Sequence, residues 1–84
     1  MKKGEALKIK IRLFATLRHY APNGEGSEFE IIHQGNLKVS NLYKLLEIPN
    51  TIDAVILLNG RHADSETIMS NGDEIVLYPT IAGG

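Results

Sequence analysis

The two glycines that end the sequence are its clearest candidates for chemistry. The chain closes on Ile81-Ala82-Gly83-Gly84, so a carboxylate on Gly84 would have no side chain beside it. Such a carboxylate can enter a narrow active site of another protein and be activated there without steric conflict. The alternative is a frayed chain end without a role. The segment Glu74–Tyr78 just upstream reads as a strand, which favours a tail that projects from a firm base.

No other group of residues has the spacing of a catalytic or metal-binding site. The chain has no cysteine, which excludes a disulfide, a thiolate zinc site and a cysteine nucleophile. Gly24 and Gly26 fall in a connection between two expected strands, so they do not form a phosphate-binding loop. We expect no metal site and no bound cofactor, because the three histidines lack the spacing of metal ligands. These histidines are His19, His33 and His62.

Size and charge narrow the possible classes of protein. The 84 residues make one domain near the lower size limit for folding without disulfides, and an apolar fraction of 43% allows a single core. The net charge of −1 gives no electrostatic reason to expect nucleic-acid binding. No apolar run reaches the length of a membrane span, and the first residues lack the apolar stretch of a signal peptide. We expect a cytoplasmic protein, monomeric when free, with no membrane association.

Two strands are expected in the first half of the chain. Residues 7–14 alternate between apolar and basic side chains, and the basic stripe consists of Lys8, Lys10 and Arg12. Residues 27–33 form a second strand, in which Glu28 and Glu30 face away from the apolar side chains. Antiparallel pairing sets these glutamates opposite the basic stripe, at about 0.2–1 kcal/mol per pair. We therefore interpret the stripe as a solvated, charge-matched face rather than as a binding patch.

One helix and a third strand are expected in the second half. The helix covers Val39–Leu46, with Ser40 as its N-cap and Pro49 as the residue that closes it. The apolar run Ala54–Leu58 predicts a strand that is covered on both faces or placed centrally. The dipeptide Asn59-Gly60 then makes a turn.

This order of elements predicts an α+β fold of the β-grasp, or ubiquitin-like, type. One helix packs across a mixed sheet of four or five strands, which buries both apolar faces. A turn at residues 71–73, which Asp73 braces, leads into the last strand. The right-handed crossover rule places that strand beside the first one, parallel to it and central in the sheet. We expect residues 1–79 to form the domain and residues 80–84 to form a flexible tail that reaches roughly 16–18 Å.

Four segments of the sequence resemble a known family. In chain order they resemble the MoaD/ThiS-type ubiquitin-like sulfur carriers, and the small subunit of molybdopterin synthase is the most similar branch. The resemblance covers most of the chain from Leu7 onward. The sequence departs from the molybdopterin branch in two ways, because it has a single proline before the tail and a short helix. The thiamin-pathway carriers and the prokaryotic protein modifiers of the same family therefore stay open. The four segments are Phe14–Arg18, Leu58–Arg61, Asn71–Glu74 and Tyr78–Gly84.

The resemblance implies a carrier protein rather than an enzyme. An ATP-dependent, ubiquitin-activating-like adenylyltransferase (MoeB/ThiF type) would adenylate the Gly84 carboxylate, and a persulfide sulfur would displace AMP to leave a thiocarboxylate. That sulfur would pass to a precursor held by the large subunit of molybdopterin synthase. The activating enzyme uses the ATP, and this chain binds none. Gly83 and Gly84 form the reactive site, because a Cβ would crowd the channel that receives them.

The residues expected to contact these partners lie in the tail or on the exposed side of the sheet. Arg61 is expected to be exposed, and to dock into an acidic groove of the activating enzyme if it faces the same side as the tail. For at least one of Leu58 and Leu77, core packing is the favoured role. The whole expected contact set is Leu58, Arg61, Leu77, Tyr78, Pro79, Ile81 and Ala82.

The sequence leaves three hypotheses about function open. The first is a sulfur carrier of a cofactor pathway, either molybdopterin or thiamin biosynthesis. The second is a ubiquitin-like modifier that forms isopeptide bonds between Gly84 and lysines of other proteins. The third is a β-grasp interaction module whose terminal glycines have no chemical use.

Overall fold

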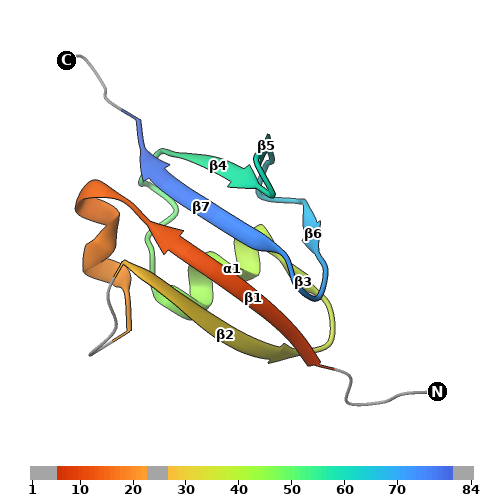
Figure 1. Ribbon diagram of the computed structural model, residues 1–84. Coiled ribbons are helices and arrows are strands. Elements are labelled where there is room, and N and C mark those ends of the chain that lie inside the picture. Colours follow the sequence, from red (N-terminus) through yellow and green to blue (C-terminus); the bar gives the residue numbers. More distant parts are fainter. Residues whose placement is uncertain (1–5, 23–26, 81–84) are drawn as a thin grey trace.

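The computed structural model describes residues 6–22 and 27–80 of the chain. A five-stranded sheet, in the order β2-β1-β7-β4-β5, has the helix α1 packed across one face, and a small sheet of β3 and β6 lies at one end (Figure 1). This architecture confirms the predicted α+β fold of the β-grasp type. The elements are β1 (Ala6–Leu13), the 3₁₀ helix η1 (Ala15–Tyr20), β2 (Glu28–Gln34), β3 (Leu37–Lys38), α1 (Val39–Leu46), β4 (Ala54–Leu58), β5 (Arg61–His62), β6 (Ile68–Met69) and β7 (Glu74–Pro79).

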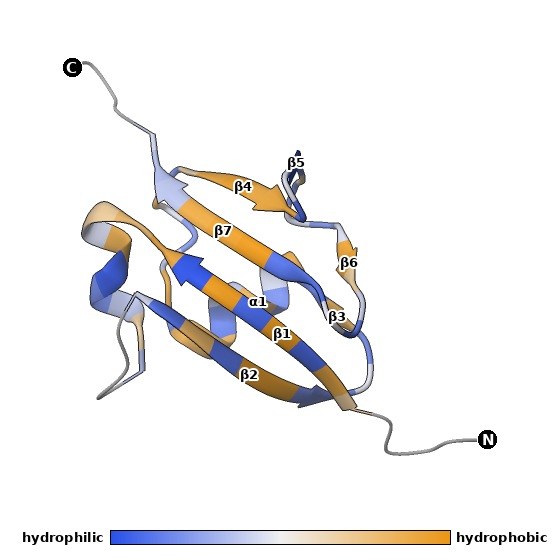
Figure 2. Cartoon of the chain, in the orientation of Figure 1, coloured by the Kyte–Doolittle hydropathy of each residue, from blue (hydrophilic) through white to orange (hydrophobic). Residues whose placement is uncertain are grey.

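The middle of the sheet is formed by β1 and β7, which run parallel as the crossover rule predicts. The β1 residues Ile9, Ile11 and Leu13 have no exposed surface, and neither have Ile75 and Leu77 of β7. Intervening positions of β1 are polar and exposed, so the hydropathy colours alternate along this strand in Figure 2. The sheet therefore has one face packed on α1 and one open face.

The open face of β1 and β2 is charge-matched. The antiparallel register pairs Lys10 with Glu30 and Arg12 with Glu28. Arg12 lies between two carboxylates, with Nε 3.7 Å from Oε2 of Glu28 and Nη1 3.5 Å from Oε2 of Glu74. All three side chains are nearly half exposed, so each pair contributes less than about 1 kcal/mol. The interpretation of the basic stripe as a solvated face is confirmed.

The start of α1 differs from the prediction. The N-cap is Lys38, so the prediction of Ser40 at this position is wrong. The N–H of Val39 donates to the carbonyl of Thr67 at 3.0 Å, and the N–H of Ser40 donates to the carbonyl of Ser65 at 3.0 Å. These loop carbonyls satisfy amides that are left without partners at a helix start. A contact between segments so distant in sequence leaves no local sequence pattern.

The end of α1 is set by Glu47, ahead of the predicted Pro49. Glu47 adopts a left-handed conformation with φ of 61°. Its N–H donates to the carbonyl of Lys44 at 3.1 Å, and the N–H of Ile48 donates to the carbonyl of Tyr43 at 2.9 Å. These two bonds form a Schellman motif, which usually carries glycine at the left-handed position. The prediction that Pro49 closes the helix is therefore corrected.

Replacing Glu47 with glycine is expected to stabilise the fold by about 0.5–1 kcal/mol, because a side chain is costly at positive φ. The free energy of unfolding in urea measures the change. As a matched control, Lys44→Gly inside the same helix is expected to destabilise by about 1 kcal/mol. An equal loss of stability in both variants would show that the left-handed position carries no strain.

The strand β4 is half-buried along its whole length. Ala54, Ile56 and Leu58 pack against the core, whereas Val55 and Leu57 alternate with them and lie on the open face. The strand has a neighbour on each side, β7 and the two-residue β5. The alternative in which both of its faces are covered is therefore wrong. Two apolar side chains of β4 are left on the open face of the sheet.

Candidate functional site

The candidate site lies where the chain leaves β7. This strand pairs with β1 along one edge and with β4 along the other. At its end, the N–H of Phe14 donates to the carbonyl of Leu77 at 3.0 Å, and the N–H of Thr80 donates to the carbonyl of Asp53 at 3.4 Å. A strand bonded on both edges resists local opening, so the tail starts from a fixed point. The predicted tail residues beyond Thr80 lie outside the described residues. They are Ile81, Ala82, Gly83 and Gly84.

A polar network fixes the other end of β7. Asn59 Nδ2 donates to Oδ1 of Asp73 at 2.9 Å, and Asn59 Oδ1 accepts from the N–H of Glu74 at 2.9 Å. The second carboxylate oxygen of Asp73 accepts from the N–H of Ser70 at 2.7 Å. The network joins the turn after β4 to the turn before β7 and so sets where β7 begins. The predicted bracing role of Asp73 is confirmed.

Replacing Asp73 with alanine is expected to destabilise the fold by about 1–3 kcal/mol, because two donors lose a charged acceptor. Chemical denaturation measures the loss. Glu66→Ala is the control, since Glu66 is exposed and its ion pair with Lys38, at 3.0 Å, contributes less than about 1 kcal/mol. The bracing role would be refuted if the two variants lost the same stability.

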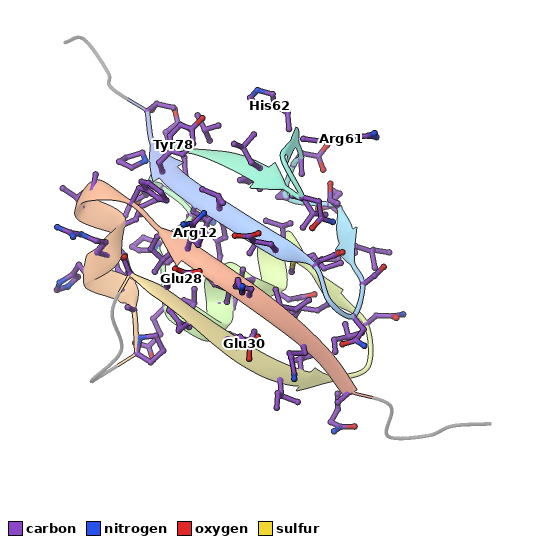
Figure 3. All side chains as sticks on the ribbon, in the orientation of Figure 1. Arg12, Glu28, Glu30, Arg61, His62 and Tyr78 are labelled. Atoms are coloured by element: carbon purple, nitrogen blue, oxygen red, sulfur yellow. The ribbon has the colours of Figure 1, made fainter. Side chains whose placement is uncertain are left out.

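The open face beside the tail carries an apolar cluster, which we call the open-face patch: Phe14, Val55, Leu57, Val76 and Tyr78. The register of β4 and β7 pairs Tyr78 with Val55 and Val76 with Leu57. The rings of Phe14 and Tyr78 meet edge to face, with centroids 6.3 Å apart. Phe14 is 46% exposed, and Tyr78 lies close to the point where the chain leaves β7 (Figure 3). An apolar and aromatic surface of this kind suits a protein partner.

The predicted contact residues separate into two groups. Tyr78 and Pro79 lie at the end of β7, beside the start of the tail. Leu77 has no exposed surface and belongs to the core, so a partner cannot contact it there. Leu58 packs on the helix side, at the end of β4 where it pairs with β5. Arg61 is exposed in β5, which pairs with the end of β4 that lies away from Pro79 (Figure 3), and its contact with a partner stays a prediction.

The sequence interpretation missed four members of the open-face patch: Phe14, Val55, Leu57 and Val76. The signal that finds them is the alternation of faces along a strand. Because Leu77 is in the core, its neighbours on β7 point to the open face, and the same reasoning applies to β4. Phe14 continues the alternation of β1 beyond Leu13, which is buried.

The described part of the chain was also searched for a metal-binding cluster and for a membrane-spanning helix. Residues 6–22 and 27–80 hold no cluster of three histidine or carboxylate side chains that could bind a metal ion. Within the same ranges, no helix has the length and apolarity needed to cross a membrane. Burial, and to a lesser extent the Asp53 carboxylate, raises the pKa of the Tyr43 hydroxyl.

The described fold is a β-grasp domain with a central last strand and an open apolar face beside the end of that strand, the architecture of ubiquitin-like proteins. Residues 11–84 match the ThiS family, and the chain belongs to that family. The resemblance to MoaD/ThiS-type proteins is thereby confirmed. Proteins of this class act as carriers or modifiers and are not catalysts. A sequence comparison with proteins of curated function finds no significant match.

Solved structures with the same fold include proteins described as subunits of a molybdopterin converting factor and proteins described as modifiers. A putative molybdopterin converting factor subunit 1 from Pyrococcus furiosus is 21% identical, with a TM-score of 0.71 over 89% of this chain and 99% of that chain. The small archaeal modifier protein 1 of Haloferax volcanii is 19% identical, with a TM-score of 0.71 over 89% and 99%. A complex of subunits 1 and 2 of the molybdopterin-converting factor from Helicobacter pylori contains a chain that is 25% identical, with a TM-score of 0.57 over 93% and 100%.

Proposed function

We propose that the chain is a sulfur carrier whose Gly84 carboxylate becomes a thiocarboxylate and donates its sulfur in molybdopterin biosynthesis. The observation that carries this proposal is the position of β7, which is central in the sheet and leads directly into the Gly-Gly ending. The match to the ThiS family extends through residue 84 and so includes that ending. The polar network at Asp73 and the bonds at Thr80 fix both ends of the strand.

The proposed chemistry takes place on Gly84 inside other proteins. An oxygen of its carboxylate attacks the α-phosphorus of ATP and releases pyrophosphate, which leaves an acyl adenylate. A donor persulfide attacks the acyl carbon, AMP leaves, and a thiol then cleaves the sulfur–sulfur bond to free the thiocarboxylate. The donor ends as a disulfide with that thiol, so the electrons balance. Glycine suits this position, because a Cβ would approach both the channel wall and the reacting carbon.

The proposed partners are a ubiquitin-activating-like adenylyltransferase and the large subunit of a molybdopterin synthase. The Helicobacter pylori match supports the second, since that structure contains two subunits of a molybdopterin-converting factor. The open-face patch offers each partner an apolar surface next to the start of the tail. One partner would bind at a time, because both need the same tail.

A modifier of other proteins is the second candidate function. The match to a small archaeal modifier protein over 89% of this chain favours it. Both functions begin with the same adenylate and differ only in the nucleophile, which is sulfur for the carrier and a lysine amine for the modifier. A thiamin-pathway carrier shares the thiocarboxylate and differs in the acceptor.

The test is to incubate the chain with ATP and the adenylyltransferase of its native host, and then to add a persulfide donor. The proposal predicts AMP release that depends on this chain, followed by thiocarboxylate on Gly84. Isopeptide conjugates without thiocarboxylate would support the modifier instead. If no adenylate formed, both candidate functions would be contradicted.

A further inference from the structure

A half-open groove of about 460 Å³ runs along the outer edge of β4, with α1 on its other side. Its volume falls within the range of about 300–1,000 Å³ that is usual for binding pockets. Because β5 pairs only with Leu57 and Leu58, no strand of the described chain covers the start of β4 on this edge. The lining combines apolar residues with one basic and one acidic residue. It includes Tyr43, Lys44, Ile48, Ile52, Asp53 and Ala54.

The backbone of Ala54 directs its hydrogen-bonding groups to the outer edge of the sheet. In an antiparallel ladder, the peptide groups of successive residues point alternately to one neighbouring strand and to the other. The Asp53 carbonyl accepts from the N–H of Thr80 at 3.4 Å, on the side of β7. The Ile56 carbonyl accepts from the N–H of Ala63 at 3.0 Å, on the side of β5. Ala54 therefore points away from β7, and neither its N–H nor its carbonyl has a backbone partner on that outer edge among the described residues.

An extended segment of another protein fits this edge as an additional strand. One residue of an antiparallel strand can exchange two hydrogen bonds with the N–H and the carbonyl of Ala54. Ala63 occupies the position opposite Ile56, so the added strand begins opposite Val55. A second β4 centred on the same pair would place its Ile52 opposite Ile56, where Ala63 already lies. The added strand therefore belongs to a different protein.

The helix side of the groove suits an apolar side chain on the added strand. Residues opposite each other in a ladder share a face, and Ala54 packs toward the core. The side chain opposite Ala54 is thus directed to the helix side, where Ile48 and Ile52 line the groove. An apolar side chain at this position removes apolar surface from water.

The two charges of the groove call for a segment that carries both signs. Asp53 and Lys44 form no ion pair, with each other or with another side chain, in the part of the chain that the structure describes. Burial and the Asp53 carboxylate raise the pKa of Tyr43, so its hydroxyl stays protonated and can donate a hydrogen bond. In an antiparallel strand, the residue opposite Asp53 follows the one opposite Ala54, and the next residue faces α1 again. A basic residue followed by an acidic one is therefore complementary to Asp53 and Lys44.

We propose that this groove binds an extended segment of a partner protein in which an apolar, a basic and an acidic residue follow one another. The apolar residue pairs with Ala54, the basic residue lies opposite Asp53, and the acidic residue turns toward Lys44 on α1. The open-face patch lies on the other face of the sheet, so the two surfaces can be occupied at the same time. This interaction does not depend on the chemistry proposed for Gly84.

Pentapeptides with blocked ends, of the form Val-X-Y-Z-Thr, are the probe. Position X is Val, Ile or Leu, position Y is Lys or Arg, and position Z is Asp or Glu. Amide and methyl NMR spectra of the full chain follow their binding. We expect the largest shifts at the Ala54 amide and at the methyl groups of Ile48 and Ile52, with Leu57 and Val76 on the open face unchanged. Saturating peptide should slow hydrogen exchange of the Ala54 amide at least tenfold, because a new hydrogen bond protects it.

Matched controls separate backbone pairing from charge. Methylation of the backbone nitrogen at X removes the donor to the Ala54 carbonyl and should weaken binding by about fivefold or more. Exchange of the charges at Y and Z should weaken binding by about threefold or more, because both contacts become repulsive. Asp53→Asn should weaken binding of the original peptides by about two- to fivefold, the effect of one exposed ion pair. Glu30→Gln, on the open face, should leave binding unchanged.

Three results would overturn the proposal. The first is that no peptide of the set shifts the Ala54 amide at about 5 mM, a concentration that detects even millimolar affinity. The second is that the methylated or the charge-exchanged peptides bind as well as the originals. The third is that the Ala54 amide shifts with protein concentration alone, which would make a second copy of the chain the occupant.

Discussion

Deletion of Gly84 is expected to abolish adenylation and sulfur transfer while leaving the fold intact. Removing one residue draws the carboxylate back by about 3.3–3.6 Å from the α-phosphate that it must attack. A misplacement of 1 Å in an active site can cost a factor of about 100 in rate, so we expect a loss of at least that size. The ATP-dependent release of AMP by the activating enzyme measures the effect.

Thermal unfolding provides the control for this deletion. Residue 84 lies beyond every element of the described fold, so the unfolding midpoint should match that of the full chain. Two results would speak against the proposed role. The first is a deletion variant that is adenylated at the normal rate, and the second is one that unfolds, which would make the tail a structural element.

Replacing Leu77 with alanine is expected to cost about 2–5 kcal/mol of stability, the usual range for a fully buried leucine. A chain of 84 residues has a total stability of about 4–13 kcal/mol at 0.05–0.15 kcal/mol per residue. The loss is therefore a large fraction of the total stability, and the variant unfolds if the total lies at the low end of this range. Urea unfolding, followed by circular dichroism, measures the change.

The neighbouring residue Tyr78 is the matched comparison, because it points to the other face of the same strand. Tyr78→Ala should lose much less stability than Leu77→Ala and should weaken binding to the activating enzyme by about 30-fold, as for an aromatic residue central to an interface. Calorimetric titration of the folded variants measures this loss. If Tyr78→Ala bound normally, the open-face patch would not be the docking surface.

The sequence predicted the fold well where buried and exposed residues alternate along a strand. The alternation in β1 identified its core face, and the crossover rule placed β7 beside it. The charge pairing of Arg12 with Glu28 followed from the same pattern. Each of these predictions rests on residues near one another in the chain or on a rule of topology that few folds violate.

The wrong predictions share a physical cause, which is contact between distant segments. The N-cap prediction failed because carbonyls of Ser65 and Thr67 satisfy the first amides of α1. The apolar run of β4 concealed which of its faces is open, since both sets of alternate residues are hydrophobic. The sequence left Leu77 between a core role and a contact role for the same reason, because Val76, Leu77 and Tyr78 are all apolar enough to be buried. Only the pairing of β7 with both β1 and β4 decides between them.

The most direct test of the proposed function is the intact mass of the protein purified from its native host. A thiocarboxylate on Gly84 predicts a species about 16 Da heavier than the unmodified chain, the difference between sulfur and oxygen. Fragmentation should place the added mass on the last residue, and the same spectrum establishes that the chain ends at Gly84. A sample that contained only the unmodified chain, under conditions in which the host makes molybdopterin, would contradict the proposal.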